Sequence, residues 1–257
     1  MLSKNKLKFI QSMERKKVRD EYNMFVAEGN KLVDEALSSG FPIELLVCTE
    51  EYFSGKNFDP TAIKEWIITD KESVKKASQL QAPQDALVVM GQFEPSKEQT
   101  DINNQLVLVL DCIQDPGNLG TILRIADWFG IQTVVCSPDT ADVYNPKVVQ
   151  ASMGAIFRVK VVYTELSGFI MKAKQNGSPV YGTFLEGKNI YEHVLTTSGL
   201  IVMGNEGNGI SAEIEQLVTD KLYIPSFAQN DAGSESLNVA VATAICCSEF
   251  RRRVDKF

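Results

Sequence analysis

Residues 106–127 read LVLVLDCIQDPGNLGTILRIAD, and this stretch decides the fold class. It begins with a continuous apolar run, 106–110, and passes through a turn containing Pro116 and Gly117 into a segment with apolar residues at helical spacing. Strands that are apolar on both faces are typical of parallel sheets covered by helices, whereas strands facing water alternate apolar and polar residues. The stretch therefore predicts one strand–turn–helix unit of an α/β fold.

The same alternation continues to the C-terminus. Short apolar runs, each a predicted strand, alternate with segments of helical spacing, and a final helix that is apolar almost all round closes the chain. The predicted strands are 106–110, 133–136, 159–163, 180–184, 200–203 and 222–224, and the predicted helices between them are 121–129, 166–175 and 212–218. We therefore predict that residues 105–257 form one α/β domain built on a parallel sheet.

The N-terminal part of the chain predicts a second, smaller α/β domain over residues 1–94. A helix-like segment, 28–39, ends at Gly40, and a second helix is predicted after the capping residue Asp70. Short β-rich runs follow or separate these helices, at 43–48, 66–69 and 86–90. Residues 95–104 are polar and aperiodic, as expected of a linker between the two domains.

Composition excludes several classes of protein. The 257 residues are 44% hydrophobic and 23% charged, as in ordinary globular proteins. No apolar run reaches the roughly 18 residues of a membrane span, so we expect a cytoplasmic protein. The five cysteines lie in apolar segments without a Cys-x-x-Cys pair, and there is one histidine. We therefore expect buried thiols and no metal site, and chemistry that needs neither a metal nor a histidine base.

Positive charge is concentrated at the N-terminus of a chain whose net charge is −7. Residues 1–20 contain seven basic side chains against two acidic ones, and a second basic cluster lies at 251–253. The seven are Lys4, Lys6, Lys8, Arg15, Lys16, Lys17 and Arg19. Local basic patches can bind phosphates on an acidic protein, so we predict that these residues contact the phosphates of a nucleic acid. The alternative is a solvated helix face together with an ordinary basic helix C-terminus.

A polar segment follows the first predicted strand of the larger domain, at the edge of a parallel sheet where ligands bind. Asn118 stands at the start of the next helix, and Arg124 lies on the same helix face as Gly120. A guanidinium and free backbone amides could converge there on a phosphate or a developing oxyanion. The alternative is a surface ion pair between Arg124 and Asp127.

Two further segments of this kind follow later strands. In the first, 200–211, Gly204, Gly207 and Gly209 would let the backbone approach a flat ligand closely. Their spacing does not match the Gly-x-Gly-x-x-Gly pattern of dinucleotide-binding folds, which argues against a nicotinamide-dependent oxidoreductase. In the second, Ser236 and Asn238 stand at the start of the final helix, either as simple caps or as site residues.

Together the three segments resemble the signature motifs of SpoU (TrmH-like) RNA 2′-O-methyltransferases of the SPOUT superfamily. The family patterns are Asn-x-Gly-x-x-x-Arg-x-Ala, then Gly-x-Glu-x-x-Gly, then Ile-Pro followed by Ser-Leu-Asn-x-x-x-Ala. The matching residues are Asn118, Gly120, Arg124, Ala126, Gly204, Glu206, Gly209, Ile224, Pro225, Ser236, Leu237, Asn238 and Ala242. Two departures affect the expected donor pocket: Ser226 replaces the usual methionine, and the loop 226–235 is longer than is common.

The resemblance implies an S-adenosylmethionine-dependent enzyme that methylates a ribose 2′-hydroxyl, with 23S ribosomal RNA as the favoured substrate and transfer RNA as the second. It implies a homodimer and a deep trefoil knot in the parallel-sheet domain, and the N-terminal domain resembles the ribosomal-protein-L30e-like substrate-binding domain. The remaining alternative is a non-catalytic RNA-binding protein of the same fold.

The resemblance also implies roles for individual residues. The reaction site would comprise Asn118, Arg124, Glu206, Ser236 and Asn238, with Arg124 also contacting RNA. The donor would be held by Met203, Gly204, Asn205, Gly207, Gly209, Ile224, Pro225, Ser236, Leu237 and Asn238.

Overall fold

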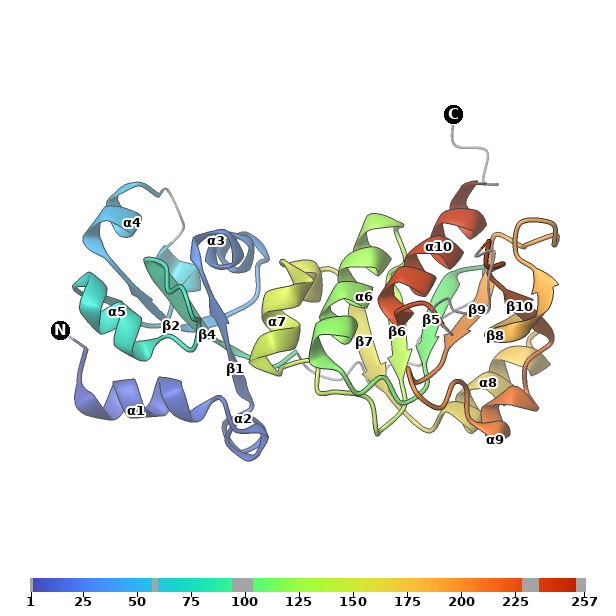
Figure 1. Cartoon of the computed structure of the whole chain (residues 1–257). Helices are drawn as coiled ribbons and strands as arrows, with labels where there is room; N and C mark the ends of the chain where they lie inside the picture. Colours follow the sequence, from blue (N-terminus) through green and yellow to red (C-terminus); the bar gives the residue numbers. More distant parts are fainter. Residues whose placement is uncertain (1, 57–59, 94–103, 228–235, 253–257) are drawn as a thin grey trace. The chain divides into compact units, whose positions relative to one another are not determined.

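The computed structural model describes residues 2–56, 60–93, 104–227 and 236–252 (Figure 1). Its contacts divide the chain into two compact units: unit 1 is Met1–Glu94 with Asp142–Arg158, and unit 2 is Pro95–Ala141 with Val159–Phe257. The expected linker lies almost wholly outside the described residues, so the domain boundaries expected from the sequence stay a prediction. No helix among the described residues is long and apolar enough to cross a membrane.

Unit 2 is built on a six-stranded sheet in which every neighbouring pair of strands is parallel. The strands are β5 (Leu106–Leu110), β6 (Thr133–Cys136), β7 (Lys160–Tyr163), β8 (Val180–Asn189), β9 (Gly199–Met203) and β10 (Asp220–Tyr223). Their order across the sheet is β10-β8-β9-β5-β6-β7, which places β5 and β9 side by side at the centre. The α/β class with a parallel sheet is confirmed, and the trefoil knot stays a prediction.

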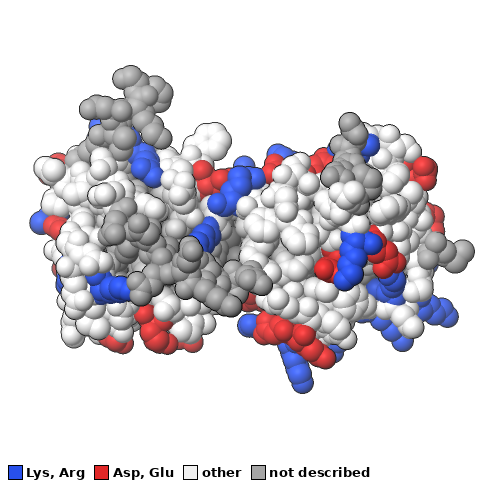
Figure 2. All heavy atoms as spheres, turned by 180° about the vertical axis from the view of Figure 1, so that it is seen from behind, with Lys and Arg blue, Asp and Glu red and all other residues white. Residues whose placement is uncertain are grey.

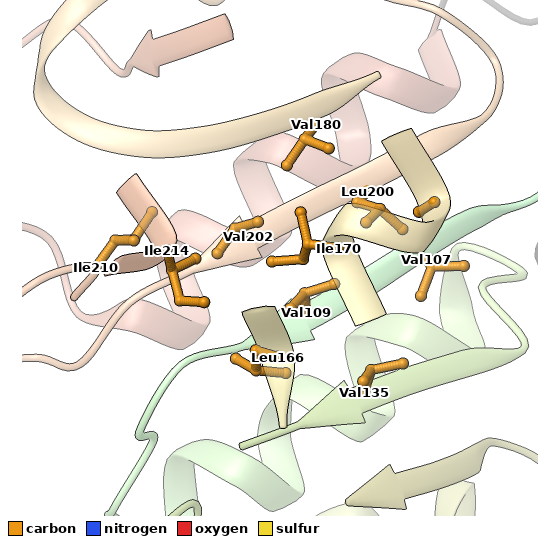
Figure 3. Packing of buried hydrophobic residues seen from close by; sticks show 11 residues of the cluster. Val107, Val109, Val135, Leu166, Ile170, Val180, Leu200, Val202, Ile210 and Ile214 are labelled. Atoms are coloured by element: carbon orange, nitrogen blue, oxygen red, sulfur yellow. The ribbon is translucent and has the colours of Figure 1, made fainter. Parts of the chain in front are cut away.

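Helices cover both faces of this sheet, as the continuously apolar strands require. They are α6 (Pro116–Trp128), α8 (Leu166–Gln175), α9 (Ala212–Glu215) and α10 (Val239–Arg252). On one face, α8 and α9 pack on valines and leucines of the central strands (Figure 3). That core contains Val107, Val109, Val135, Leu166, Ile170, Ala173, Val180, Leu200, Val202, Ile210 and Ile214. The long helices α6 and α10 pack on one another, α6 contacting β6 and α10 contacting β9.

A local signal explains where the helix α6 begins. The helix α6 starts at Pro116, because Asp115 caps it by accepting a hydrogen bond from the Asn118 backbone N–H at 2.8 Å. This start is five residues before the predicted one, since the first turn contains Gly117 and Asn118 rather than a helical apolar pattern. The strand β8 continues past its predicted end at residue 184 to Asn189, with residues 185–188 exposed.

Unit 1 contains a mixed four-stranded sheet of order β1-β4-β2-β3. The strands are β1 (Met24–Glu28), β2 (Ile43–Cys48), β3 (Trp66–Ile68) and β4 (Ala86–Gly91). The sequence prediction started a helix at Glu28 and missed β1. Glu28 instead ends β1, and Gly29, with a φ of 95°, turns the chain into the helix α3 (Asn30–Ser38).

The helices of unit 1 form two layers, one on each face of the sheet (Figure 1). The first layer is α1 (Lys4–Ser12) and α5 (Lys71–Ala77), whose Ile10, Val74 and Ala77 share a core with inward-facing strand residues. The second layer is α3 and α4 (Glu50–Ser54), with a short helix η1 at Pro60–Ala62. The helix α2 (Lys16–Tyr22) follows α1 beside β1, and its Val18 packs against the core of the first layer. The expected cap of α5 is confirmed: Asp70 accepts a hydrogen bond from the Ser73 N–H at 2.9 Å.

Unit 1 also contains Asp142–Arg158, which lies between β6 and β7 in the sequence. This segment forms α7 (Pro146–Ser152) and η2 (Ala155–Phe157), and α7 packs against β1. The ring of Tyr144 lies 5.0 Å from that of Phe25, and Phe157 lies 6.3 Å from Phe93. The Phe93 N–H also donates to the Tyr144 hydroxyl at 2.9 Å. The segment therefore supplies part of the aromatic core of unit 1.

Candidate active site at the carboxyl ends of the central strands

The glycine-rich segment forms a tight loop at the carboxyl end of β9. We call residues 204–209 the glycine loop. Asn205 and Gly209 exchange two backbone hydrogen bonds of 2.9 Å, and Gly209 has a left-handed φ of 68°. A Cβ on Gly204 would stand 2.3 Å from backbone atoms of Gly209 and Ile210. The loop can therefore close only because residue 204 has no side chain.

The side chain of Asn205 organises this loop from within. Its Oδ1 accepts hydrogen bonds from the N–H groups of Gly207 at 2.9 Å and Asn208 at 3.0 Å, while its Nδ2 donates to the Cys112 carbonyl oxygen at 2.8 Å. Asn205 was predicted to hold a ligand. Its side-chain amide is bonded to the protein at both ends and so shapes the loop, while its role in holding a ligand stays a prediction.

A second group after β5 ties the glycine loop to the sheet, and the sequence prediction missed it. Asp111 is buried, its N–H donates to the Met203 carbonyl oxygen at 2.9 Å, and its carboxylate accepts from the Ser211 N–H at 2.7 Å. The next residue, Cys112, has a φ of 59° and donates its N–H to the Ser137 hydroxyl at 2.9 Å. The one available signal was the polar residue directly after a buried strand.

The thiol nearest this site is not an activated nucleophile. Burial raises the pKa of Cys112 above its ordinary value, and the carboxylates of Asp139, Asp111 and Glu206 raise it further. A raised pKa keeps the thiol protonated at neutral pH. The other four cysteines are buried, as expected.

One hydrogen-bonded chain joins residues of all three sequence motifs. The Asn118 Nδ2 donates to the Glu206 carboxylate at 2.6 Å, and the Asn238 Nδ2 donates to the Asn118 Oδ1 at 2.9 Å. Asn238 also caps α10, since its Oδ1 accepts from the Ala240 N–H at 3.0 Å. The cap and the site role predicted as alternatives for Asn238 are thus compatible. Three of the five predicted reaction-site residues are brought into direct contact.

The other two predicted reaction-site residues lie on the same elements. Arg124 is exposed on α6, two turns after the cap residue, and the described residues give its guanidinium no hydrogen-bond or ion-pair partner, including Asp127. A guanidinium left uncommitted beside a polar cluster can bind an anionic group. Ser236 is exposed immediately before α10.

The residues expected to wall the donor pocket are placed in two settings. Met203 ends β9 and is buried, with its carbonyl oxygen bonded to Asp111. Ile224 and Pro225 are half-buried just after β10, while Leu237 is 49% exposed before α10. Most of the loop 226–235, with its expected extra length, falls outside the described residues.

The basic residues expected to contact RNA divide into two groups. Lys4, Lys8, Arg15, Lys16 and Lys17 are exposed on unit 1. Lys6 is half-buried and paired with Glu65.

Arg19 requires a correction. It is 2% exposed, and its guanidinium donates to the carbonyl oxygens of Met13 at 2.8 Å and Glu14 at 2.7 Å and to the Asp142 carboxylate at 2.6 Å. A guanidinium held in this way inside unit 1 has no free face for a phosphate, so Arg19 is a structural residue.

The basic cluster at the end of α10 is also used within the protein. Arg251 donates to the carbonyl oxygens of Phe129 at 2.8 Å and Gly130 at 3.0 Å, and so satisfies the C-terminal end of α6. Arg252 pairs with Glu249 at 2.9 Å, and residue 253 lies outside the described residues. These contacts favour the expected alternative of an ordinary basic helix end.

Comparison with known families decides what this arrangement belongs to. The SpoU rRNA Methylase family matches residues 105–248, more than half of the chain, from the start of the central sheet into α10. The chain belongs to the SpoU rRNA Methylase family. Residues 4–88 of this SpoU protein match the MRM3-like substrate binding domain. The resemblance inferred from the three motifs is confirmed.

Individual relatives cover the whole SpoU chain. The protein named 23S rRNA (guanosine(2553)-2′-O)-methyltransferase RlmP from Bacillus subtilis is 32% identical over 247 residues, which are 96% of each chain. A TrmH-family protein from Porphyromonas gingivalis has a similar structure, with a TM-score of 0.87, 39% identity and coverage of 99% of this chain and 100% of that one. An rRNA methyltransferase from Sinorhizobium meliloti, solved with AdoMet bound, gives a TM-score of 0.81 at 28% identity, covering 99% and 97%. The SpoU protein is an RNA methyltransferase.

Proposed function

We propose that this protein transfers the methyl group of S-adenosylmethionine to a ribose 2′-hydroxyl of ribosomal RNA. The observation that carries the proposal is the chain Asn238–Asn118–Glu206, which gathers the polar side chains of three separated motifs beside the glycine loop. The B. subtilis relative bears the name of a 23S rRNA 2′-O-methyltransferase, which supports the same reaction and RNA class.

The glycine loop fits a flat donor molecule. It needs glycine at 204 and at 209, and it leaves residues 206–209 exposed at the carboxyl end of β9. Backbone groups of the loop, together with Met203, Ile224, Pro225 and the segment 236–238, would hold the donor. S-adenosylmethionine would supply a methyl group on a sulfonium, whose sulfur would keep the electron pair of the broken C–S bond and leave as a neutral thioether, so no metal is needed. The proton of the 2′-hydroxyl would pass to water.

The chain's own residues must orient the ribose and make its hydroxyl reactive. A guanidinium cannot act as a base, because its pKa is above about 12. Arg124 therefore stabilises negative charge developing on the 2′-oxygen and binds a flanking phosphate. The Asn118–Glu206 contact fixes one wall of the site, and Ser236 lies at its edge. A substrate without a 2′-hydroxyl has nothing to methylate, so DNA is excluded.

Unit 1 would hold the rest of the RNA. The match to a substrate binding domain covers α1 to β4, and the exposed basic residues Lys4, Lys8, Arg15, Lys16 and Lys17 lie within it. Lys6 is committed to Glu65 and adds less.

We also propose that the protein is a homodimer through α6 and α10. The two helices pack together and expose Trp128, which is 84% exposed, and Val241, at 50%; Leu237, just before α10, is 49% exposed. Exposed apolar side chains gathered on adjoining elements are typical of protein interfaces. Sedimentation velocity of the purified chain measures the oligomeric state, and a monomer at micromolar concentration would contradict the dimer.

The decisive experiment supplies the purified protein with methyl-labelled S-adenosylmethionine and one nucleic acid at a time: protein-free ribosomal RNA, transfer RNA, or DNA of matched sequence. Label is expected in ribosomal RNA, at a nucleotide whose 3′ phosphodiester resists alkaline cleavage. Label in transfer RNA alone would change the substrate, and label that leaves every bond alkali-sensitive would exclude the ribose. An absence of both labelling and S-adenosylmethionine binding would favour a non-catalytic RNA-binding protein.

A further inference from the structure

The two helical layers of unit 1 carry opposite charge. The layer of α1 and α5 has six lysines and one acidic residue, whereas the layer of α3 and α4 has one lysine and four acidic residues. The first set is Lys4, Lys6, Lys8, Lys71, Glu72, Lys75 and Lys76, and the second is Lys31, Asp34, Glu35, Glu50 and Glu51. In Figure 2, which views the molecule from behind, Lys and Arg atoms gather at the lower right, where α1 lies. A polyanion should therefore approach unit 1 from the α1–α5 side.

The lysines of α1 and α5 belong to one continuous surface. Lys4, Lys8 and Gln11 follow one another at helical spacing, so they form a stripe along one side of α1. Gln11 donates its Nε2 to the Lys76 carbonyl oxygen at 2.8 Å, which joins this stripe to the last turn of α5. Lys75 and Lys76 are both exposed on that turn.

Four of these lysines are not neutralised by the protein. Lys4, Lys8, Lys75 and Lys76 are exposed and have no ion-pair partner among the described residues. By contrast, Lys6 pairs with Glu65, and Lys71 pairs with Asp85 at 3.2 Å.

The hollow beside α1 has a different character. A groove of about 580 Å³ runs along the other side of the helix and is lined by two ion pairs, Lys6 with Glu65 and Lys64 with Glu44. Its cations are already balanced by carboxylates, so it offers little attraction to phosphate. The unbalanced positive charge of α1 lies instead on the side of the helix that carries Lys4 and Lys8.

We propose that Lys4, Lys8, Lys75 and Lys76 form a lysine ridge that binds the phosphate backbone of the substrate RNA. The proposal rests on the proposed function for the identity of the RNA, and it adds α5 to the N-terminal residues expected from the sequence. Phosphates of the RNA relieve the repulsion between the uncompensated lysines, and the cations condensed on the RNA are released. Such contacts fix the position of the RNA, while base contacts elsewhere select the sequence.

Stabilisation of the helix α5 by its own lysines must be distinguished from RNA binding. Lys75 and Lys76 lie in the last turn of α5, where any cation favours the helix dipole. Lys172 provides a matched control, because it is exposed in the last turn of α8 in unit 2. Lys31 is an exposed lysine on the acidic layer of unit 1. The pair Lys31→Gln/Lys172→Gln removes the same charge as Lys75→Gln/Lys76→Gln without touching the lysine ridge.

The test measures binding of a fluorescein-labelled, 40-nucleotide stem–loop RNA to the full chain between 50 and 300 mM KCl. If both lysines contact phosphates, Lys75→Gln/Lys76→Gln makes the negative slope of log K against log[KCl] shallower by about 1.4–1.8, which weakens binding by about 25- to 60-fold at 0.1 M KCl. Lys4→Gln/Lys8→Gln should act in the same direction. The control pair should leave the slope unchanged, and S-adenosylmethionine titration should show unit 2 intact in every variant.

The outcomes separate this surface from the reaction. Equal slopes for the ridge variants, the control and the wild type, in a protein that methylates RNA, would overturn the lysine ridge alone. A shallower slope in the ridge variants of a protein that binds RNA but never methylates it would uphold the lysine ridge and refute the proposed function. Equal losses in the ridge and control pairs would mean nonspecific charge attraction, which also overturns the ridge.

Discussion

Replacing Gly204 by alanine should damage the donor site, whereas the same change at Gly168, on α8 and outside the glycine loop, should not. The new Cβ at 204 would lie 2.3 Å from the Gly209 carbonyl carbon and from the Ile210 nitrogen, where ordinary contact begins at 3.4 Å. Both neighbours are backbone atoms, so no side chain can rotate away. At Gly168, which is exposed on α8, an added Cβ would meet no atom within 4 Å beyond its own helix backbone and chain neighbours.

The magnitude follows from what must move. Opening the loop by about 1 Å breaks the two Asn205–Gly209 backbone hydrogen bonds, each of 2.9 Å and each worth about 0.5–1.5 kcal/mol. Overpacking of a tight site adds about 1–3 kcal/mol. The glycine loop should therefore lose about 2–6 kcal/mol in Gly204→Ala. If the donor binds only the closed loop, the lower figure alone weakens its affinity by about 30-fold.

Isothermal titration of S-adenosylmethionine, with thermal unfolding measured alongside, gives both quantities. We expect Gly204→Ala to bind the donor at least about 30-fold more weakly than wild type, and Gly168→Ala to bind within about threefold of wild type because its Cβ meets no close contact and lies outside the glycine loop. Equal affinity and equal Tm for the two variants would refute the assignment of the glycine loop as the donor site.

Three further changes have expected results. Arg124→Ala should lower the methylation rate by about 10²–10³ with donor affinity unchanged, and a wild-type rate would remove Arg124 from the reaction. Burial raises the pKa of Glu28 above its ordinary value, so its contribution to stability is present at acid pH and is lost as pH rises through the raised pKa. In Glu28→Gln the urea midpoint should therefore gain less on acidification than in the wild type, whereas Glu21→Gln, at an exposed site, should behave as the wild type does. Arg19→Met, which leaves Asp142 without its partner, should lower the free energy of unfolding by about 3–5 kcal/mol, measured with urea, and a loss under about 1 kcal/mol would contradict the buried role.

The strands and the motif positions were accessible from the sequence because their signals are local. The run 106–110 predicted β5 to the residue, and Asp70 predicted the start of α5. The elements that were missed lack such a signal. β1 merges into a helical pattern that Gly29 interrupts, and α7 packs against β1, which lies more than 100 residues upstream.

The residues of the candidate site were predictable from the sequence, but the hydrogen bonds that hold them in place were not. The order of the three motifs predicted that Asn118, Glu206 and Asn238 belong to one site, and hydrogen bonds connect these three side chains in the structure. The buried carboxylate of Asp111 is a single residue after a strand, and its partner lies 100 positions away. The internal role of Arg19 was equally hidden, because a lysine- and arginine-rich helix carries no mark of which cation faces inward.

Residues 142–158 belong to unit 1, so unit 1 cannot finish folding during synthesis until this later segment has been translated. Tyr144 and Phe157 pack on Phe93 and its neighbours, yet they emerge from the ribosome some fifty residues later. Domains generally fold as units from the N-terminus, but here the first unit must wait for a strand pair of the second to be translated. A nascent chain arrested after residue 94 would expose the ring faces of Phe25 and Phe93 that Tyr144 and Phe157 contact in the complete chain.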